Sequence, residues 1–311
     1  MSELNMTLNI SHLSELEGLA LASGSVPCPA AVVEAGDMHI MEAVVKARRS
    51  GLIAPIAIGR EEDIRDVLKK LDEDEKYYTI ENADTPEQSA FRAAQLVRAG
   101  QARIIVKGLI ETAVLMRQMI NKETGILTPG RIVSSVAVIE TPKYHKLFAM
   151  TDMGINTFPD VERKVGIINN AVAIMHAVGV ETPKVAVLSS IERVNPKQID
   201  TVEAAEIKAM NERGEIKGCL VEGPIALDLA VRKDAAEIKK YESPVAGDAD
   251  VLVVPNILCA NMLIKGIGIF GEMDTADIVV GCDVPIVFGS RGGPVEAKYN
   301  SIALCVLASG G

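Results

Sequence analysis

Short apolar runs alternate along the chain with segments of helical length that carry their apolar residues on one side. The first part of this pattern predicts strands at 30–33, 55–58, 77–81 and 103–106, and helices at 38–50, 61–71, 86–99 and 109–121. Strands that alternate with helices in this way build parallel sheets covered by helices. The chain is therefore predicted to begin with an α/β domain.

The pattern changes near residue 130, where two extended runs follow each other. The runs at 131–140 and 146–151 are separated by Thr-Pro-Lys-Tyr-His and predict a hairpin. Alternation then resumes, with helices predicted at 160–178, 200–212, 226–240, 257–270 and 294–308, and strands at 184–189, 218–221, 251–255, 277–280 and 284–288. The turn residues at 125–130 mark the predicted border of the first domain.

The composition is that of a globular protein with a large core. Of the 311 residues, 48% are hydrophobic and 24% are charged. The uncharged stretches at 18–33 and 251–264 are shorter than a membrane span and contain Pro, Ser, Asn or Gly, so no transmembrane helix is predicted. The first twenty residues hold no Lys or Arg, which a secretory signal needs, and we expect a cytoplasmic protein.

Charge and cysteine content narrow the classes of function. A net charge of −10 argues against general nucleic-acid binding, although a few local cations can still hold a small anion. The five Cys are widely separated, with no pair at metal-ligand spacing and only four His in the chain. The Cys are predicted to be free thiols, mostly in the core, and no metal site is expected.

The strongest candidate for chemistry is the loop Gly289-Ser-Arg-Gly-Gly293 before Pro294. It follows an apolar run and precedes a helix, so backbone N–H groups and the positive end of the helix dipole should meet there. Arg291 adds a forked cation and Ser290 a hydroxyl, a pair suited to a phosphate or a developing oxyanion. The alternative is a capping Ser beside a solvent-exposed Arg.

Two more strand ends are candidates by the same argument. Lys107-Gly108-Leu109 closes a strand and begins the helix that carries Arg117, where a merely solvated Arg is the alternative. Asn256 stands at a strand-to-helix corner. The loop 152–156, Asp-Met-Gly-Ile-Asn, is expected to make local turn bonds.

The sequence Gly266-Ile-Gly-Ile-Phe-Gly271 matches a dinucleotide-binding fingerprint only in its letters. The fingerprint requires glycines directly after a strand, whereas these come about ten residues later, at the far end of a predicted helix. We interpret them as chance or as a helix C-cap. Without a glycine-rich phosphate-binding motif, the sequence does not favour an enzyme that uses nicotinamide cofactors or nucleoside triphosphates. None of the four His has a Ser or Cys partner that the sequence identifies, so a His-based catalytic triad is not predicted.

Several segments together resemble the phosphate acetyltransferase and phosphate butyryltransferase family. They are Val254-Pro-Asn-Ile-Leu-Cys-Ala-Asn-Met-Leu-Ile-Lys265, Val280-Gly-Cys-Asp-Val-Pro-Ile-Val-Phe-Gly-Ser-Arg291, Glu222-Gly-Pro-Ile-Ala-Leu-Asp228 and Ser243-Pro-Val-Ala-Gly-Asp-Ala-Asp250. The Lys107 turn, Arg117 and the loop 152–156 sit where that family has related segments. The resemblance extends from about residue 28 onward.

The resemblance implies a two-domain α/β fold, each domain with a parallel-type sheet flanked by helices and with the active-site cleft between them. The first domain is expected to be discontinuous, 1–130 plus about 285–311, and the second to cover 131–284. The implied reaction is reversible transfer of an acyl group between coenzyme A and inorganic phosphate by direct thiolate attack in a ternary complex. No cofactor is implied, and the expected partners are acyl-CoA, phosphate and a second copy in a homodimer.

The resemblance also implies roles for individual residues. Ser290 would bond the reacting thiol or oxyanion, and Arg291 and Arg117 would hold the phosphoryl group. Lys107 and Gly108 would line the coenzyme A site. Asn256 and Gly292 are further expected substrate-binding residues.

The chain departs from the acetyl-specific members at the expected proton acceptor. Those members carry an Asp seven residues after the Ser, where this chain has Ala297, and Glu296 is the candidate base instead. A Cys of the acetyl branch appears as Met153, and a second phosphate-binding Arg has no match. The Lys107-Gly-Leu turn and the Ser-Arg pair followed by Glu-Ala-Lys resemble the butyryl branch more closely, so butyryl or a similar short acyl group is expected.

Two alternatives remain open at this level. One is a metal-dependent decarboxylating dehydrogenase of hydroxy acids on a similar two-domain fold, which needs clustered Asp residues and a nicotinamide site. The other is a non-catalytic module that binds acyl-CoA or phosphate, which the missing Asp suggests.

Overall fold

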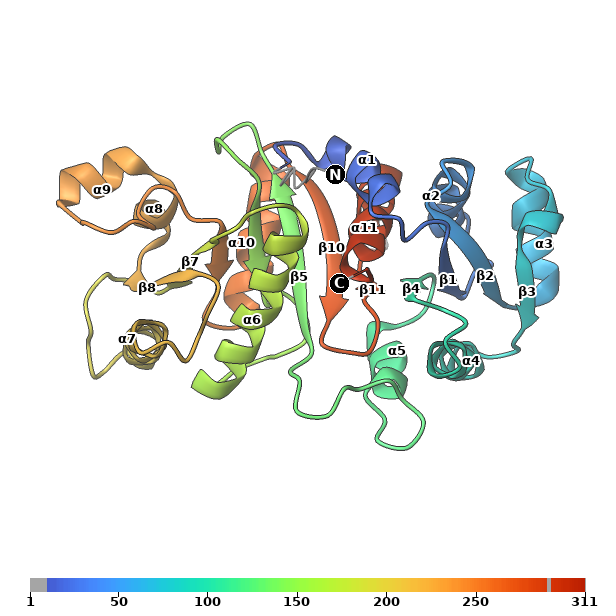
Figure 1. The fold of residues 1–311 in the computed structure, drawn as a ribbon, viewed down its shortest axis with the longest axis horizontal. Coiled ribbons are helices and arrows are strands. Elements are labelled where there is room, and N and C mark those ends of the chain that lie inside the picture. The colour runs from blue at the N-terminus through green and yellow to red at the C-terminus, as the bar shows by residue number, and fades with distance from the viewer. Residues whose placement is uncertain (1–9, 290–291, 311) are drawn as a thin grey trace, which may run out of the picture. The chain divides into compact units, whose positions relative to one another are not determined.

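The computed structural model describes residues 10–289 and 292–310 and divides the chain into two compact units (Figure 1). The terminal unit contains Ser14–Val133 and the described residues from Thr275 onward. The central unit contains Ser134–Asp274 together with the described residues up to Leu13.

The terminal unit runs to Val133, three residues beyond the predicted border, and two further segments differ from the predicted domain bounds. Residues 275–284 belong to the terminal unit because β10 (Asp274–Val280) pairs antiparallel with β11 (Ile286–Val287). The segment 10–13 belongs to the central unit, where Glu140 accepts hydrogen bonds from Leu13 N at 2.8 Å and pairs with His12 Nδ1 at 2.7 Å.

The terminal unit is built on a mostly parallel sheet with strand order β3-β2-β1-β4-β11-β10. Its other strands are β1 (Cys28–Val33), β2 (Ile53–Gly59), β3 (Thr79–Asn82) and β4 (Ile104–Lys107). Its helices are α1 (Leu16–Ala22), α2 (Met38–Arg49), α3 (Glu61–Lys70), α4 (Pro86–Arg98), α5 (Thr112–Met119) and α11 (Val295–Ala308), with short 3-10 turns at Leu13–Glu15 and Glu75–Tyr77. Figure 1 shows α4 and α5 on one face of this sheet and α2, α3 and α11 on the other.

The order of these strands creates a switch point beside β1. The chain runs from β1 to β2 and β3 on one side, then returns so that β4 lies on the other side. Because β1, β4 and β11 are parallel, their carboxyl ends meet at one edge. In open α/β sheets, ligands bind at the carboxyl ends beside such a switch point.

The central unit has strand order β5-β6-β9-β7-β8. Its strands are β5 (Ser134–Glu140), β6 (Phe148–Thr151), β7 (Lys184–Leu188), β8 (Leu220–Ile225) and β9 (Val251–Val253). Its helices are α6 (Val161–Ala177), α7 (Ile199–Glu212), α8 (Leu227–Val231), α9 (Lys233–Lys239) and α10 (Ile257–Phe270). β5 and β6 form the predicted antiparallel hairpin, and the other pairs are parallel.

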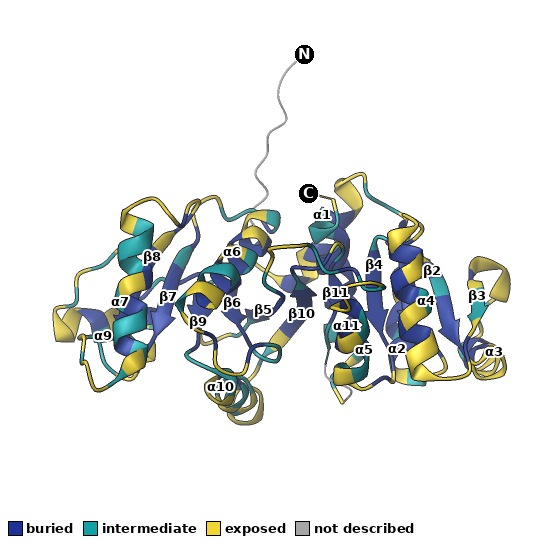
Figure 2. Cartoon of the chain, turned by 90° about the horizontal axis from the view of Figure 1, so that it is seen from below, coloured by how far each residue is buried: buried dark blue, intermediate teal, exposed yellow. Residues whose placement is uncertain are grey.

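Burial follows the predicted apolar runs. Figure 2 shows strands that are mostly buried and helices that are exposed on their outer faces. The α/β class with helix-flanked, mostly parallel sheets is confirmed, and each sheet also holds one antiparallel pair, which makes it mixed. None of the helices in the described part of the chain is long and apolar enough to cross a bilayer.

Two local predictions about elements have clear outcomes. The glycines at 266–271 lie at the end of α10, with Gly271 as its C-cap, which confirms the interpretation as a helix end. The helix predicted at 226–240 is wrong in its length, because Arg232 takes an extended conformation (φ −124°, ψ 112°) and separates α8 from α9.

Candidate functional site

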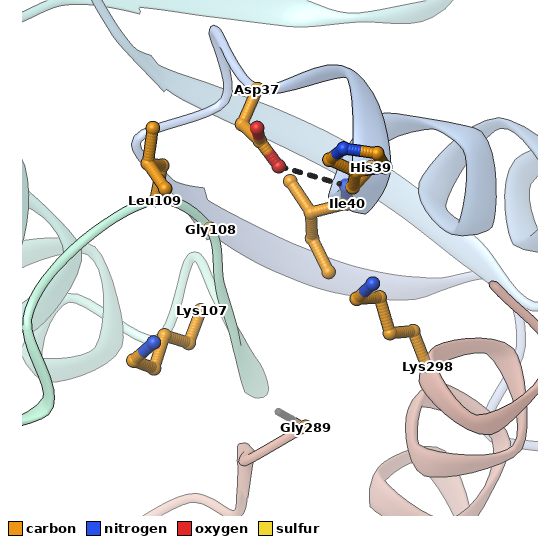
Figure 3. Close-up of a pocket in the computed structure, with 8 residues that line it drawn as sticks. All are labelled: Asp37, His39, Ile40, Lys107, Gly108, Leu109, Gly289 and Lys298. Carbon is orange, nitrogen blue, oxygen red and sulfur yellow. Dashed lines mark hydrogen bonds between the residues drawn. The ribbon is translucent and has the colours of Figure 1, made fainter. Parts of the chain in front are cut away.

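A small pocket lies at the switch point of the terminal unit (Figure 3). Its volume is about 70 Å³, enough for a small group such as a sulfur atom with ordered water. We call it the β4 pocket; it is lined by Asp37, His39, Ile40, Lys107, Gly108, Leu109, Gly289 and Lys298. The predicted Lys107 turn and the start of the Gly289 loop thus come together.

The pocket takes its walls from the segments that follow three parallel strands. Lys107 ends β4, Gly289 follows β11, and Asp37 is the N-cap of α2 after β1 (Figure 3). Asp37 Oδ1 accepts from Ile40 N at 3.2 Å. The helices α2 and α11 both begin near this edge. The N-terminus of a helix attracts anions, because its backbone N–H groups are unpaired and its dipole is positive there.

Gly108 is required by the close approach of two strand ends. Its N–H donates to Val33 O at 2.8 Å. A Cβ at position 108 would overlap the carbonyl oxygens of Val33 and Glu34, so no other residue fits without moving backbone. The glycine therefore fixes the distance between the ends of β1 and β4, and with it the shape of the pocket.

Lysine side chains supply the positive charge of the β4 pocket. Lys107 is 9% exposed and Lys298 is 5% exposed. Lys298 lies one turn into α11, and its Nζ donates to Gly293 O at 2.7 Å. Because helical side chains tilt toward the N-terminus, a lysine at this position returns to the loop that precedes the helix.

The remaining predicted residues of the terminal unit lie outside this pocket. Ser290 and Arg291 fall outside the described residues, and Gly292 is exposed. Arg117 is exposed on α5 and makes no side-chain hydrogen bond or ion pair with the part of the chain that the structure describes. Glu296 is also exposed, and its carboxylate binds Lys46 Nζ of α2 at 2.6 and 2.8 Å.

The predicted Asn256 lines a larger pocket at the carboxyl ends of β7 and β9 in the central unit. Asn256 is the N-cap of α10, and its Oδ1 accepts from Cys259 N at 3.1 Å. The pocket measures about 830 Å³, within the range of small-molecule sites. Its walls are mostly apolar, with Phe158, Ile199 and Met262 among them, and Lys164 pairs with Glu203 at 2.5 Å.

The loop 152–156 is organised by one buried carboxylate. Asp152 is 3% exposed. Its Oδ1 accepts from the N and Oγ of Ser135 and from Gly154 N and Ile155 N, and its Oδ2 accepts from Asn156 N at 2.9 Å and Asn156 Nδ2 at 2.6 Å. The local turn bonds expected from the sequence are present, and Ser135 adds a link to β5.

The thiols behave as predicted for core cysteines. Cys28, Cys219, Cys282 and Cys305 are buried, and Cys259 is exposed. Burial raises the pKa of Cys219 to about 11 and that of Cys282 to about 12, so these thiols resist ionisation. They are therefore unsuited to act as nucleophiles.

Asp37, His39 and Lys298 are pocket residues that the sequence analysis did not select. Asp37 could have been selected from the sequence, because it lies in the turn between a predicted strand and a predicted helix. Lys298 had a weaker signal, because its return to the loop depends on the direction of a helical side chain rather than on a place beside a strand end.

The fold is that of an α/β protein with a lysine-lined pocket at the switch point of a sheet. Comparison with known proteins identifies its family. A model of the family described as phosphate acetyl/butaryl transferase matches residues 73–306. The chain belongs to this family and is an acyltransferase, as the resemblance predicts, which leaves the dehydrogenase alternative without support.

Individual relatives agree with this assignment. The phosphate butyryltransferase of Clostridium acetobutylicum is 39% identical over 280 residues, covering 90% of this chain and 93% of that protein. The phosphate acetyltransferase of Thermotoga maritima is 39% identical over 274 residues, covering 88% and 92%. A branched-chain phosphotransacylase from Enterococcus faecalis has a similar structure, with a TM-score of 0.80 at 31% identity over 91% of this chain and 99% of that one.

Proposed function

We propose that the protein transfers a short acyl group reversibly between coenzyme A and inorganic phosphate. Family membership supports the reaction class. The observation that supports the proposal is the β4 pocket, which is lined by Lys107 at the end of β4, by Lys298 of α11 and by Gly289. Positive charge at such an edge suits both phosphate and a thiolate.

The proposed mechanism is direct attack in a ternary complex. The coenzyme A thiolate attacks the carbonyl carbon of the acyl phosphate, a C–S bond forms, and the C–O bond to phosphate breaks. Negative charge gathers on the carbonyl oxygen and on the leaving phosphate, where cations and N–H donors stabilise it most. Ser290, Arg291, Arg117 and Gly292 are assigned to these groups on the sequence pattern, and Glu296 stays a prediction as proton acceptor.

The acyl preference is testable with a series of thioesters. The Lys107-Gly-Leu turn and the Glu-Ala-Lys that follows the Ser-Arg pair favour butyryl, so we expect kcat/KM to rise from acetyl-CoA through propionyl-CoA to butyryl-CoA, by about tenfold for each added methylene. Release of free thiol in the presence of phosphate measures each rate. A preference for acetyl-CoA would contradict the assignment to the butyryl branch.

We also propose that the protein works as a homodimer that buries the outer face of α10. This helix packs Ala260 and neighbouring side chains on the central core, while Leu258, Met262, Ile269 and Phe270 stay exposed, Phe270 to 92%. Lys265 is its sole charged residue. A helix that is apolar on nearly all sides is normally buried, which here requires a partner.

A second copy fits this face in area and charge. Phe158 and Ile199 are also exposed and line the same pocket as Met262, so the apolar surface continues beyond the helix. Six such side chains expose roughly 600–900 Å², close to the roughly 800 Å² that each partner buries in a stable complex. Copies with a net charge of −10 repel each other least where acidic residues are absent, as on α10.

The dimer proposal predicts a change of mass with one substitution. Light scattering should give twice 33.2 kDa for the unchanged protein and 33.2 kDa for Phe270→Glu, because a carboxylate cannot be buried unpaired in an apolar contact. Phe91→Glu on α4 is the matched control and should remain a dimer. A monomeric unchanged protein, or a dimeric Phe270→Glu, would refute this interface.

A further inference from the structure

Asp277 is a half-buried carboxylate on β10 for which the sequence-based mechanism has no role. Within the described part of the chain its side chain accepts one hydrogen bond, from Thr275 Oγ1 at 3.0 Å, and forms no ion pair. Removal from water raises the pKa of Asp277 to about 6, although the bond from Thr275 acts in the opposite direction. Such a carboxylate is mostly ionised at pH 7 and is still able to take up a proton.

The strand register places Asp277 on the face of the sheet that also carries Lys107. Val279 pairs with Ile286 of β11, and Ile286 pairs with Ile105 of β4. Paired residues share a face and side chains alternate along a strand, so Asp277 and Lys107, each two residues further on, leave the sheet on the same side. Both lie level with the residue after β11, two strand spacings apart, or roughly 10 Å between their Cα atoms.

Two backbone hydrogen bonds hold Asp277 at the carboxyl end of β11. Its carbonyl accepts from Phe288 N at 2.9 Å, directly before Gly289 of the β4 pocket. Its N–H donates to Ser301 Oγ at 2.8 Å, and that hydroxyl donates to Ala297 O at 2.6 Å. Asp277 is thus fixed between the start of the Gly289 loop and the first turns of α11.

Glu296, the proton acceptor predicted from the sequence, has a different environment. It is exposed, and its carboxylate binds Lys46 Nζ at 2.6 and 2.8 Å. Taking up a proton there would break this ion pair. At Asp277 a proton instead removes a charge that is held away from water, which is favourable for a group that must accept one.

We propose that Asp277 accepts the proton of the coenzyme A thiol. This inference rests on the proposed function. The S–H proton passes to a carboxylate oxygen of Asp277, directly or through one water, while the sulfur lone pair forms the C–S bond. The C–O bond to phosphate breaks with its electrons on the leaving phosphate, and Asp277 then releases the proton to solvent. In the reverse direction, protonated Asp277 returns the proton to the leaving thiolate.

The chemistry of thiols gives the size of the effect. A free thiol with a pKa near 8.5 is only about 3% ionised at pH 7, and a positioned proton acceptor typically contributes about a hundredfold or more to the rate. Without the acceptor, the reaction depends on thiolate from solution, which increases roughly tenfold for each pH unit up to about pH 8.5. The contribution of Asp277 should therefore be large at pH 7 and small near pH 9.

The pH dependence of Asp277→Asn tests the proposal. With acyl phosphate and coenzyme A as substrates, this variant should form thioester about a hundredfold more slowly than the unchanged protein at pH 7 and about fivefold more slowly at pH 9. Asp277→Glu, which keeps the carboxylate, should retain about a tenth or more of the activity at pH 7. Asp274→Asn, which removes an exposed carboxylate from the same strand, is the matched control and should leave the profile unchanged.

Thermal unfolding separates a catalytic role of Asp277 from a structural one. Because its pKa is raised to about 6, the unchanged protein loses stability as the pH rises from about 4 through 6, where this carboxyl ionises in the folded state. Asp277→Asn does not ionise, so its unfolding temperature at pH 7 should equal or exceed that of the unchanged protein. A structural role predicts a lower one.

The pH profile must be assigned against the other titratable groups near Asp277. They are Asp274 on the same strand, Cys282 and Asp283 in the turn that follows it, Lys107 on β4, and Glu296, Lys298 and Tyr299 on α11. Glu296→Gln distinguishes the two candidate acceptors. If Glu296→Gln, rather than Asp277→Asn, shows the loss confined to low pH, the proposal is wrong.

Other outcomes would also overturn the role of Asp277. An equal loss at pH 7 and pH 9 with a lower unfolding temperature would show a structural role, and an unchanged rate at both would remove Asp277 from the reaction. If Asp277→Asn does not fold, Asp277→Glu must shift the acidic limb of the pH–rate profile, or the proposal fails. The proposed function fails separately, by absence of acyl transfer in the unchanged protein at any pH.

Discussion

Gly108→Ala should abolish most of the acyl transfer and lower the stability of the terminal unit. The new Cβ would overlap the carbonyl oxygens of Val33 and Glu34, which are backbone atoms and cannot rotate away. The strand end must shift, the bond from Gly108 N to Val33 O at 2.8 Å weakens, and the β4 pocket changes shape. We expect a loss of about 2–3 kcal/mol in stability and of about a hundredfold in kcat/KM.

A Gly→Ala substitution at another glycine of the terminal unit is the control. Gly18 lies exposed within α1, and a Cβ there meets nothing within 4 Å. Gly18→Ala should therefore stabilise the unit by up to about 1 kcal/mol, through helix propensity. Thermal unfolding followed by circular dichroism compares the two variants. Equal unfolding temperatures and rates for both would contradict the close approach at Gly108.

Asp152→Asn should destabilise the central unit strongly although it changes few atoms. The two carboxylate oxygens accept from donors of Ser135, Gly154, Ile155 and Asn156 and donate to none. An amide must turn its NH₂ toward donors on one side, which leaves buried groups unpaired. We expect a cost of about 3 kcal/mol, or a drop of about 6–12 °C in the unfolding temperature of this unit.

Asp160→Asn is the matched control for this prediction. Asp160 is the exposed N-cap of α6, and its side chain accepts from Arg163 N at 2.9 Å. Asn and Asp cap helices about equally well, so the unfolding temperature should change little. Calorimetry resolves the transitions of the two variants, and a drop of similar size in both would contradict the role assigned to Asp152.

Much of the fold could be predicted because strand and helix periods are local properties. The hairpin of β5 and β6, the alternation on either side of it and the helix end at Gly271 all follow from short patterns. The break at Arg232 could not be predicted, because favourable helical residues on both sides hide it. The grouping of 275–284 also escaped prediction, because it depends on a pairing of β10 with β11 that no local pattern encodes.

The pocket residues that could be predicted from the sequence are those that directly follow a strand. Lys107 and Gly108 follow β4 and line the β4 pocket, and Asn256 follows β9 and lines the pocket of the central unit. Lys298 was not found, because it lies inside α11 and reaches the pocket only through the direction of a helical side chain. For Ser290 and Arg291, whose roles rest on sequence alone, the assignment stays a prediction, as does a cleft between the domains.

The proposed reaction depends most on phosphate as the acceptor of the acyl group. Purified protein should release free thiol from butyryl-CoA only when inorganic phosphate is added, with a rate that saturates in phosphate and with one acyl phosphate formed for each thiol released. Thiol release at the same rate without phosphate would show a hydrolase. No thiol release from acetyl-, propionyl- or butyryl-CoA, despite measurable binding of coenzyme A, would contradict the proposed transfer.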